Sequence, residues 1–195
     1  MPVRKGEDFS FQENDAVFDA KIQSKLPQGP LDREGLLSLL EDLNVKTTTL
    51  DHQPLFTVDD SRNVQENLDG GHTKNLFLKD KKGNYFLLTA EQDTQVNLKT
   101  LHKLLGGSSR FSFGKPEALL ELLGVIPGSV TAFGVVNDRD NRVKFAIDSN
   151  LMSHDKINCH PLSNDATTTI DRDDLLEFAR LTGHEAQIVD LSEEV

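Results

Sequence analysis

The sequence has a single cysteine, no long apolar run and too few basic residues to balance its acidic ones. Cys159 alone cannot form an internal disulfide, which fits a reducing compartment. No segment approaches the roughly 18 consecutive apolar residues that a membrane-spanning helix needs. Residues 1–20 also lack the apolar core of about 7 to 15 residues that marks a secretory signal. We therefore expect a soluble, cytoplasmic protein with no membrane partner.

Several motifs of common enzyme classes are also missing. The sequence contains no G-x-S-x-G nucleophile elbow, no H-E-x-x-H pair and no cysteine pair that could hold zinc. The segment "GGHTKN" at 70–75 lacks the spacing and the Lys-Ser/Thr ending of a phosphate-binding P-loop. Cys159 and His160 are adjacent, but consecutive side chains of a strand point to opposite faces, so they do not form a thiol–imidazole pair. We expect no metal and no other cofactor.

The charge balance limits the kinds of partner that the protein can bind. Lysine and arginine total 21 against 32 acidic residues, a net charge of −11, which disfavours nonspecific adhesion to a polyanion such as DNA. Any contact with nucleic acid must therefore be local. Lys81 and Lys82 fit a solvated turn equally well. The basic residues available for a local contact are Lys74, Lys79, Lys81, Lys82, Arg110 and Lys115.

The 195 residues, with 36% apolar and 27% charged content, are typical of one globular domain. Residues 1–30 lack periodicity and end in "LPQGP", so we expect an N-terminal arm, a domain over 31–191 and a tail over 192–195. Asp32 is the expected N-cap of the first helix. Leucine spacing and capping residues predict helices over 31–45, 57–71, 96–107, 115–124 and 171–183. Extended segments are expected over 46–52, 110–113, 156–162, 166–170 and 186–191.

Two β-hairpins are predicted. The first joins "NLFL" to "YFLL" across "KDKKGN", and the second covers 127–148 with its turn at 138–141. Helices and hairpins are mixed without a regular βαβ alternation. The sequence therefore predicts an α+β domain with a largely antiparallel sheet.

Lys74 stands at the start of the first predicted hairpin. In a strand it shares one face with Leu76 and Leu78, while Asn75 and Phe77 point the other way, so both faces are partly apolar and the strand is central. A lysine at the end of such a strand either meets an anion or extends to solvent.

Two further features could form a cleft with this lysine. In "IPGSVTAFG", the turn at Gly128 can direct consecutive backbone N–H groups toward a carboxylate, a phosphate or a developing oxyanion. His160, just before Pro161, either joins that cleft or satisfies a backbone carbonyl. The residues alone thus predict a cleft but do not identify its substrate.

Four ordered motifs together resemble a known family: "GGHTKNLFLKDKKGNYFLL", "LGVIPGSVTAFGVVND", "CHPLSNDATTTI" and "LLEFARLTGHEAQIVDL". They are similar to the aminoacyl-tRNA editing family related to the insertion domain of bacterial prolyl-tRNA synthetase. The likeness is strongest to its freestanding branch, which deacylates mischarged alanyl-tRNA(Pro), and covers 31–191. It implies an α+β domain with a mixed, largely antiparallel, barrel-like sheet flanked by helices.

The resemblance also implies a set of site residues. The characteristic lysine of the family falls on Lys74, and the asparagine that accompanies it in the alanine-specific branch falls on Asn75. The family often has proline where this sequence has Ala132. The implied catalytic residues are Lys74, Gly128, Ser129 and His160. The implied substrate-binding residues are Asn75, Thr131, Phe133, Asn164, Thr167 and Thr168.

The expected function is trans-editing, in which the enzyme hydrolyses the ester of mischarged Ala-tRNA(Pro) and protects proline codons. Amides of Gly128 and Ser129 would stabilise the oxyanion, Lys74 would hold a phosphate or the ester, and the terminal hydroxyl of the tRNA would act as base. The expected partner is the tRNA(Pro) acceptor end, with prolyl-tRNA synthetase or an elongation factor adding affinity. Alternatives are a Cys-, Ser- or Thr-tRNA deacylase and a non-catalytic regulator that binds the tRNA end or an amino acid. A generic esterase is disfavoured because the elbow is missing.

Overall fold

The computed structural model describes residues 19–54 and 68–192. Most of the helix expected over 57–71 and most of the arm expected over 1–30 therefore lie outside the described residues, while Gly71, the last residue of that expected helix, begins a strand. No helix in the described part is long and apolar enough to cross a membrane. The helical elements are α1 (Ala20–Gln23), α2 (Arg33–Asp42), α4 (Leu101–Leu104), α5 (Pro116–Leu123), α6 (Arg172–Leu181) and the 3-10 helices η1 (Ala132–Asn137) and η2 (Ser149–Ser153). The strands are β1 (Thr47–Asp51), β2 (Gly71–Lys79), β3 (Tyr85–Glu91), β4 (Ser112–Phe113), β5 (Val143–Asp148), β6 (Lys156–Cys159), β7 (Ala166–Asp171) and β8 (Gln187–Val189).

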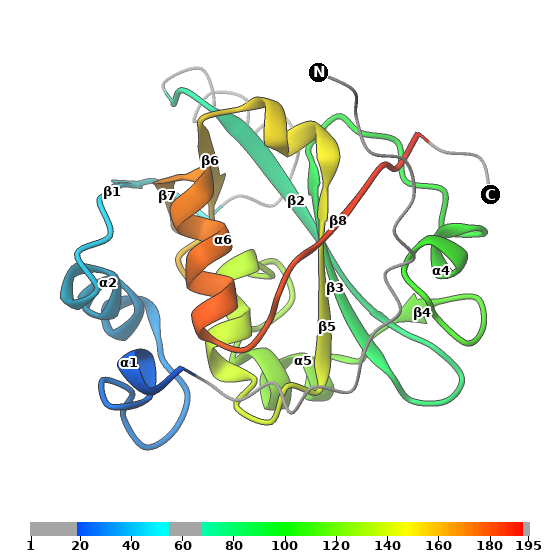
Figure 1. Cartoon of the computed structure of the whole chain (residues 1–195), viewed down its shortest axis with the longest axis horizontal. Helices are drawn as coiled ribbons and strands as arrows, with labels where there is room; N and C mark the ends of the chain where they lie inside the picture. Colours follow the sequence, from blue (N-terminus) through cyan, green and yellow to red (C-terminus); the bar gives the residue numbers. More distant parts are fainter. Residues whose placement is uncertain (1–18, 55–67, 193–195) are drawn as a thin grey trace, which may run out of the picture.

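The eight strands form one sheet in the order β1-β7-β6-β2-β3-β5-β8, and β4 pairs with β2 beside this path. The β1–β7, β6–β7, β2–β3 and β2–β4 pairs are antiparallel, and the other pairs are parallel. The order has β1 and β8 at its edges, so the barrel-like sheet is not closed within the described residues. The predicted α+β class with a mixed, largely antiparallel sheet flanked by helices is confirmed (Figure 1).

The first predicted hairpin is confirmed as β2 and β3, which pair from Thr73 opposite Glu91 to Lys79 opposite Tyr85. Gly83 takes a φ of +89° in the turn. The buried carboxylate of Asp80 accepts hydrogen bonds from the backbone and side chains of Asn84 and Ser108, at 2.8–3.0 Å. Burial alone would raise the pKa of Asp80, but these donors hold it well below its ordinary range. The turn is thereby fixed to the loop that precedes β4.

Apolar side chains fill both faces of the β2–β3 region. The larger core lies between the sheet and α2, α5, α6 and η1, and the smaller one lies under α4 (Figure 1). Asp32 caps α2 as predicted, accepting from the Gly35 amide at 2.9 Å, and Leu36 and Leu40 are fully buried. Ile22 of α1 is also fully buried in the larger core, so part of the segment expected as an arm packs against the domain.

The second predicted hairpin is wrong in its first half. Residues Ala132–Asn137 form η1 instead of a strand, and only Val143–Asp148 is extended, as β5. The hydroxyl of Thr131 accepts from the Phe133 amide at 3.3 Å and caps the 3-10 helix. The run is buried on every side, so its apolar character fits a short buried helix as well as a strand.

A buried polar network joins the end of η1 to the end of α6. The Asp138 carboxylate accepts from the Val143 amide at 2.7 Å and lies 3.0 Å from His184 Nε2. The Nδ1 atom of His184 lies 3.0 Å from the Thr182 hydroxyl, which donates to the Ala179 carbonyl. Asp138 and His184 are both almost fully buried, so their contact belongs to a network that is shielded from water.

We expect Asp138→Ala to lower the free energy of unfolding by about 3 to 5 kcal/mol, the usual effect of removing one member of a buried pair. The substitution removes the buried carboxylate that accepts from the Val143 amide and lies 3.0 Å from His184 Nε2. Urea unfolding measures the change, and Asp140→Ala, at an exposed neighbouring position, is the control with a change of about 0.5 kcal/mol or less. Equal loss in both variants would contradict the role given to Asp138.

Candidate functional site

The candidate site lies at a gap beside β2. On the edge of β2 away from β3, β6 pairs only with Gly71 and His72, and β4 pairs only with Leu78 and Lys79. Between them, the described residues place no strand opposite the middle of β2. A loop from α5 to η1, which includes Gly128, approaches the strand at this gap.

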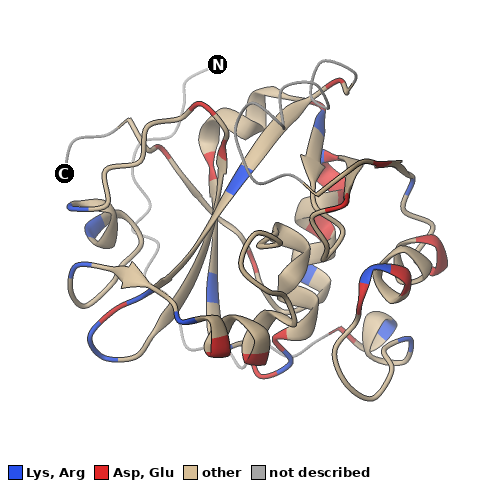
Figure 2. Ribbon diagram, turned by 180° about the vertical axis from the view of Figure 1, so that it is seen from behind, with Lys and Arg blue, Asp and Glu red and all other residues tan. Residues whose placement is uncertain are grey.

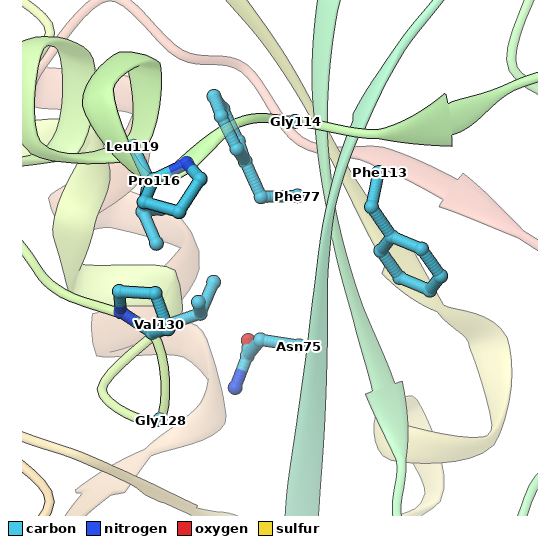
Figure 3. A pocket seen from close by; sticks show the side chains of 9 residues that line it. Asn75, Phe77, Phe113, Gly114, Pro116, Leu119, Gly128 and Val130 are labelled. Atoms are coloured by element: carbon cyan, nitrogen blue, oxygen red, sulfur yellow. The ribbon is translucent and has the colours of Figure 1, made fainter.

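The gap contains a cavity of ≈ 190 Å³. A single water needs only about 10–15 Å³, so a small organic group fits. Figure 3 shows Asn75, Phe77 and Val130 directed into the space between β2 and the Gly128 loop, whereas the Phe113 ring points away from it. The lining is mostly apolar. It consists of Asn75, Phe77, Phe113, Gly114, Pro116, Leu119, Pro127, Gly128 and Val130.

Asn75 supplies the carboxamide of this lining. Its Oδ1 accepts a hydrogen bond of 2.6 Å from the hydroxyl of Thr89, which lies opposite it on β3 and is fully buried. With the oxygen fixed in this way, the amide nitrogen is directed toward Gly128 (Figure 3). The cavity therefore has a hydrogen-bond donor with a fixed orientation on an otherwise apolar wall.

The Gly128 loop presents its backbone to the cavity. Gly128 takes a φ of +94°, and a Cβ atom there would lie 3.5 Å from the Asn164 amide nitrogen. Asn164 thus lies next to Gly128. The Ser129 amide, however, donates to the Ile126 carbonyl at 3.0 Å within the turn. Only the Gly128 amide of the expected pair is therefore available to a ligand.

Thr131 and Phe133 do not reach the cavity, contrary to the substrate-binding role expected of them. Both are fully buried. The Thr131 hydroxyl caps η1, and the Phe133 ring packs edge-to-face against Phe178 at 5.6 Å between centroids. They support the Gly128 loop from below. Ala132 occupies the first position of η1, and the first position of a helix is one that also accommodates proline.

Lys74 and Asn75 diverge because neighbouring side chains of a strand point to opposite faces. Lys74 lies on the face that carries Leu78 of the smaller core, and its Nζ donates to the carbonyls of Gln92, at 2.9 Å, and Thr94. It is not among the residues that line the cavity. In this structure the lysine closes the loop that follows β3.

His160 belongs to a second polar group at the end of β6, with His52 and Thr167. The His160 Nδ1–H donates to the Ala166 carbonyl at 3.1 Å, so Nε2 is the acceptor of the neutral ring. Burial lowers the pKa of His160, and the ring of His52 lies 6.4 Å away between centroids. Thr167 Oγ1 lies 2.9 Å from His52 Nε2. The hydroxyl of Thr168 points elsewhere and lies 2.9 Å from that of Thr49 on β1.

The charged residues are unevenly distributed. Figure 2 shows lysine and arginine around α4, the β2–β3 turn and the β4 region, whereas aspartate and glutamate dominate α2, α5 and α6. A local basic surface thus exists in spite of the net charge of −11. Among the described residues, no group of three His, Cys, Asp or Glu side chains could hold a metal ion.

Several residues of the cavity wall and of the hydrogen-bonded groups around Asn75 and His160 were not predicted from the sequence, among them Thr89, His52 and Val130. Thr89 could have been found, because the hairpin turn fixes the register that places it opposite Asn75. His52 and Val130 gave no such signal, since their contacts join segments far apart in the chain.

Comparison with known proteins defines the class of this fold and site. A family model described as aminoacyl-tRNA editing domain matches residues 52–178, and the chain belongs to this family. The match includes Lys74, Asn75, Gly128 and His160.

Among its relatives are proteins linked by name to prolyl-tRNA. The chain is 39% identical over 161 residues to prolyl-tRNA synthetase associated domain-containing protein 1 of Mus musculus, covering 80% of this chain and 95% of that protein. It is 31% identical over 161 residues to the prolyl-tRNA editing protein ProX of Acetoanaerobium sticklandii, covering 82% of this chain and 97% of that protein. This chain is thus a ProX-like, prolyl-tRNA-synthetase-associated type of editing domain.

The fold is shared with a solved structure. A candidate trans-editing enzyme for prolyl tRNA synthetase superposes with a TM-score of 0.61, covering 90% of this chain and 99% of that chain at 20% identity. At this identity the likeness concerns the arrangement of helices and strands alone.

We expect Thr89→Val to release the Asn75 carboxamide while keeping the β-branched shape of the buried side chain. The lost hydrogen bond should lower the free energy of unfolding by about 0.5 to 1.5 kcal/mol. The side-chain amide NMR signals of Asn75 should broaden or shift. Thr89→Ser keeps the hydroxyl and should restore these signals. Unchanged signals in Thr89→Val would show that Thr89 does not orient the amide.

We expect the His160 imidazole to titrate below the ordinary value of 6.5, because burial disfavours its charged form. Its contribution to stability is then complete above about pH 6.5 and is lost as the pH falls through its folded-state pKa. Ring ¹⁵N chemical shifts against pH measure this and also report the proton on Nδ1. A titration above 6.5, or a proton on Nε2 in the neutral form, would contradict the assignment.

Proposed function

We propose that this protein is a trans-editing deacylase that hydrolyses the ester of mischarged Ala-tRNA(Pro). The observation that carries the proposal is the small, mostly apolar cavity between Asn75 and the Gly128 loop, in a chain that belongs to the aminoacyl-tRNA editing family. Trans-editing acts on the mischarged tRNA after the synthetase has released it. The similarity over nearly the whole length of two relatives that are linked by name to prolyl-tRNA supports this proposal.

The reaction needs no nucleophile from the protein. Burial raises the pKa of the Cys159 thiol to about 12, so its thiolate is not available at neutral pH. Water therefore attacks the carbonyl carbon of the ester. The carbonyl oxygen receives the negative charge and accepts from the Gly128 amide, and the bond between this carbon and the adenosine oxygen then breaks. A proton of the attacking water passes through the remaining hydroxyl of the same ribose to the leaving oxygen of the adenosine.

Alanine is selected over proline by size. A synthetase pocket that fits proline discriminates against a smaller side chain by only about 1 to 3 kcal/mol per methylene, so a second sieve is needed. The cavity walls include Phe77, Pro127 and Val130, whose backbone and ring atoms allow little adjustment. In this proposal the methyl group of alanine lies beside these walls, and the walls reject the larger pyrrolidine ring of proline.

The tRNA is held locally. Lys74 exchanges the carbonyls of Gln92 and Thr94 for a phosphate of the acceptor end, because the charged acceptor makes the stronger hydrogen bond. With a net charge of −11, few phosphates are neutralised, and prolyl-tRNA synthetase or an elongation factor contributes the remaining affinity.

The central experiment incubates the full chain with tRNA(Pro) charged in turn with alanine, cysteine, serine and proline, and with tRNA(Thr) charged with threonine. Loss of the alanyl ester with retention of the prolyl ester is expected. Preferred loss of the cysteinyl, seryl or threonyl ester would identify a sister specificity. No loss from any of them, with retained binding of the charged tRNA, would identify a binding module and contradict the proposal.

We expect Lys74→Ala to lower kcat/KM for Ala-tRNA(Pro) by about 10- to 100-fold, since a hydrogen bond to a charged group contributes about 1.5 to 3 kcal/mol. Lys46→Ala, at an exposed position away from the β2–β3 hairpin and α4, is the control and should retain wild-type kcat/KM. Full activity in Lys74→Ala would remove Lys74 from the proposed site.

A further inference from the structure

The backbone N–H and C=O groups of β2 are directed alternately to the two edges of the strand. The His72 carbonyl accepts from the Gln92 amide at 2.9 Å, on the side of β3, and the Phe77 carbonyl accepts from the Gly114 amide at 2.8 Å, on the opposite side. In an antiparallel pair, successive residues alternate between the two edges, and each directs both its N–H and its C=O the same way. The N–H and C=O of Asn75 therefore point away from β3.

These two groups face the gap between β6 and β4. Of the two neighbouring outward residues, Thr73 donates from its hydroxyl to the Asn158 carbonyl at 2.8 Å, and the Phe77 carbonyl accepts from the Gly114 amide at 2.8 Å. No described strand pairs with Asn75 on this edge. Within the described residues, Asn75 of the central strand thus presents a backbone donor and acceptor without a hydrogen-bond partner, beside the cavity that its own side chain lines.

We propose that this open edge at Asn75 binds the aminoacyl group of the substrate as it would bind one residue of a neighbouring antiparallel strand. The α-ammonium group donates to the Asn75 carbonyl, and the ester carbonyl accepts from the Asn75 N–H. This proposal rests on the proposed function and deepens it, because it assigns the recognition of the α-amino acid unit to main-chain atoms.

The chemistry of the occupant follows from the spacing of these groups. In such a pair the two residues exchange N–H···O bonds, so the ligand needs a donor and an acceptor separated by one α-carbon. An α-amino ester has both, whereas an acyl ester without the amine has only the acceptor. Paired L-residues place their side chains on the same face, so the methyl group of alanine enters the cavity on the Asn75 side.

The same contact supplies a second donor to the reacting oxygen. The Ser129 amide is held by Ile126, so the Gly128 amide lacks its expected companion. The Asn75 N–H takes that place across the cavity. An ester carbonyl held by Gly128 and Asn75 is polarised by two backbone donors that need no reorganisation.

The test replaces the backbone amide of residue 75 by an ester, using the α-hydroxy analogue of asparagine in the full chain. The side chain is kept and the N–H is lost. We expect kcat/KM for Ala-tRNA(Pro) to fall about tenfold, the equivalent of about 1.4 kcal/mol. The same replacement at Leu88 is the control. It removes an N–H of the β2–β3 ladder, so it should lower Tm more than the change at 75 and leave kcat/KM unchanged. Wild-type kcat/KM in the residue 75 variant would overturn the proposal.

A binding measurement separates this proposal from the proposed function. The hydrolysis-resistant probe is 3′-alanylamino-3′-deoxyadenosine, and its propionyl counterpart lacks the amine. The alanyl probe should shift the Asn75 backbone ¹H–¹⁵N signal downfield, and the propionyl probe should bind at least tenfold more weakly. An inactive wild type that shows this shift would contradict the deacylase activity and retain the edge contact. An active wild type that does not show the shift would support the deacylase activity and contradict the edge contact.

Discussion

The candidate site depends on the incomplete pairing of β2. This strand is paired with β3 from Thr73 to Lys79, but on its other edge it meets β6 only at its beginning and β4 only at its end. Complete pairing on both edges would leave no space for the cavity and no open backbone group. The Gly128 loop and the Asn164 side chain fill part of the gap without closing it. Under the proposed function, recognition of a small group uses backbone hydrogen-bonding groups that the described strands leave unpaired.

Much of this fold could be predicted from local patterns in the sequence. The Asp32 cap, the Gly83 turn and the antiparallel β2–β3 hairpin were all predicted, because each depends on residues close together in the chain. The segment that forms η1 was assigned to a strand, since a short apolar run buried on all sides has no periodicity that distinguishes the two. Its conformation depends on packing against α5 and α6, which local sequence does not encode.

The site was predicted in part, and its errors have a common cause. The strand period already separated Lys74 from Asn75, and the structure places them on opposite faces. The Ser129 amide was expected to face the substrate, but it is bonded within its own turn. Phe133 was expected to bind substrate, but it is fully buried. Residue types thus indicated the segments that meet, whereas the donors that remain available depend on hydrogen bonds within each loop.

The divergence of Lys74 and Asn75 has a consequence for the evolution of such proteins. The two residues are neighbours in the chain, yet β2 and its side chains separate the surroundings of one from those of the other. A substitution that reshapes the cavity next to Asn75 therefore leaves the carbonyls that hold Lys74 in place. Under the proposed function, amino-acid preference and retention of the tRNA can then change independently, so a duplicated gene could acquire a new specificity through a few changes on one side of a single strand.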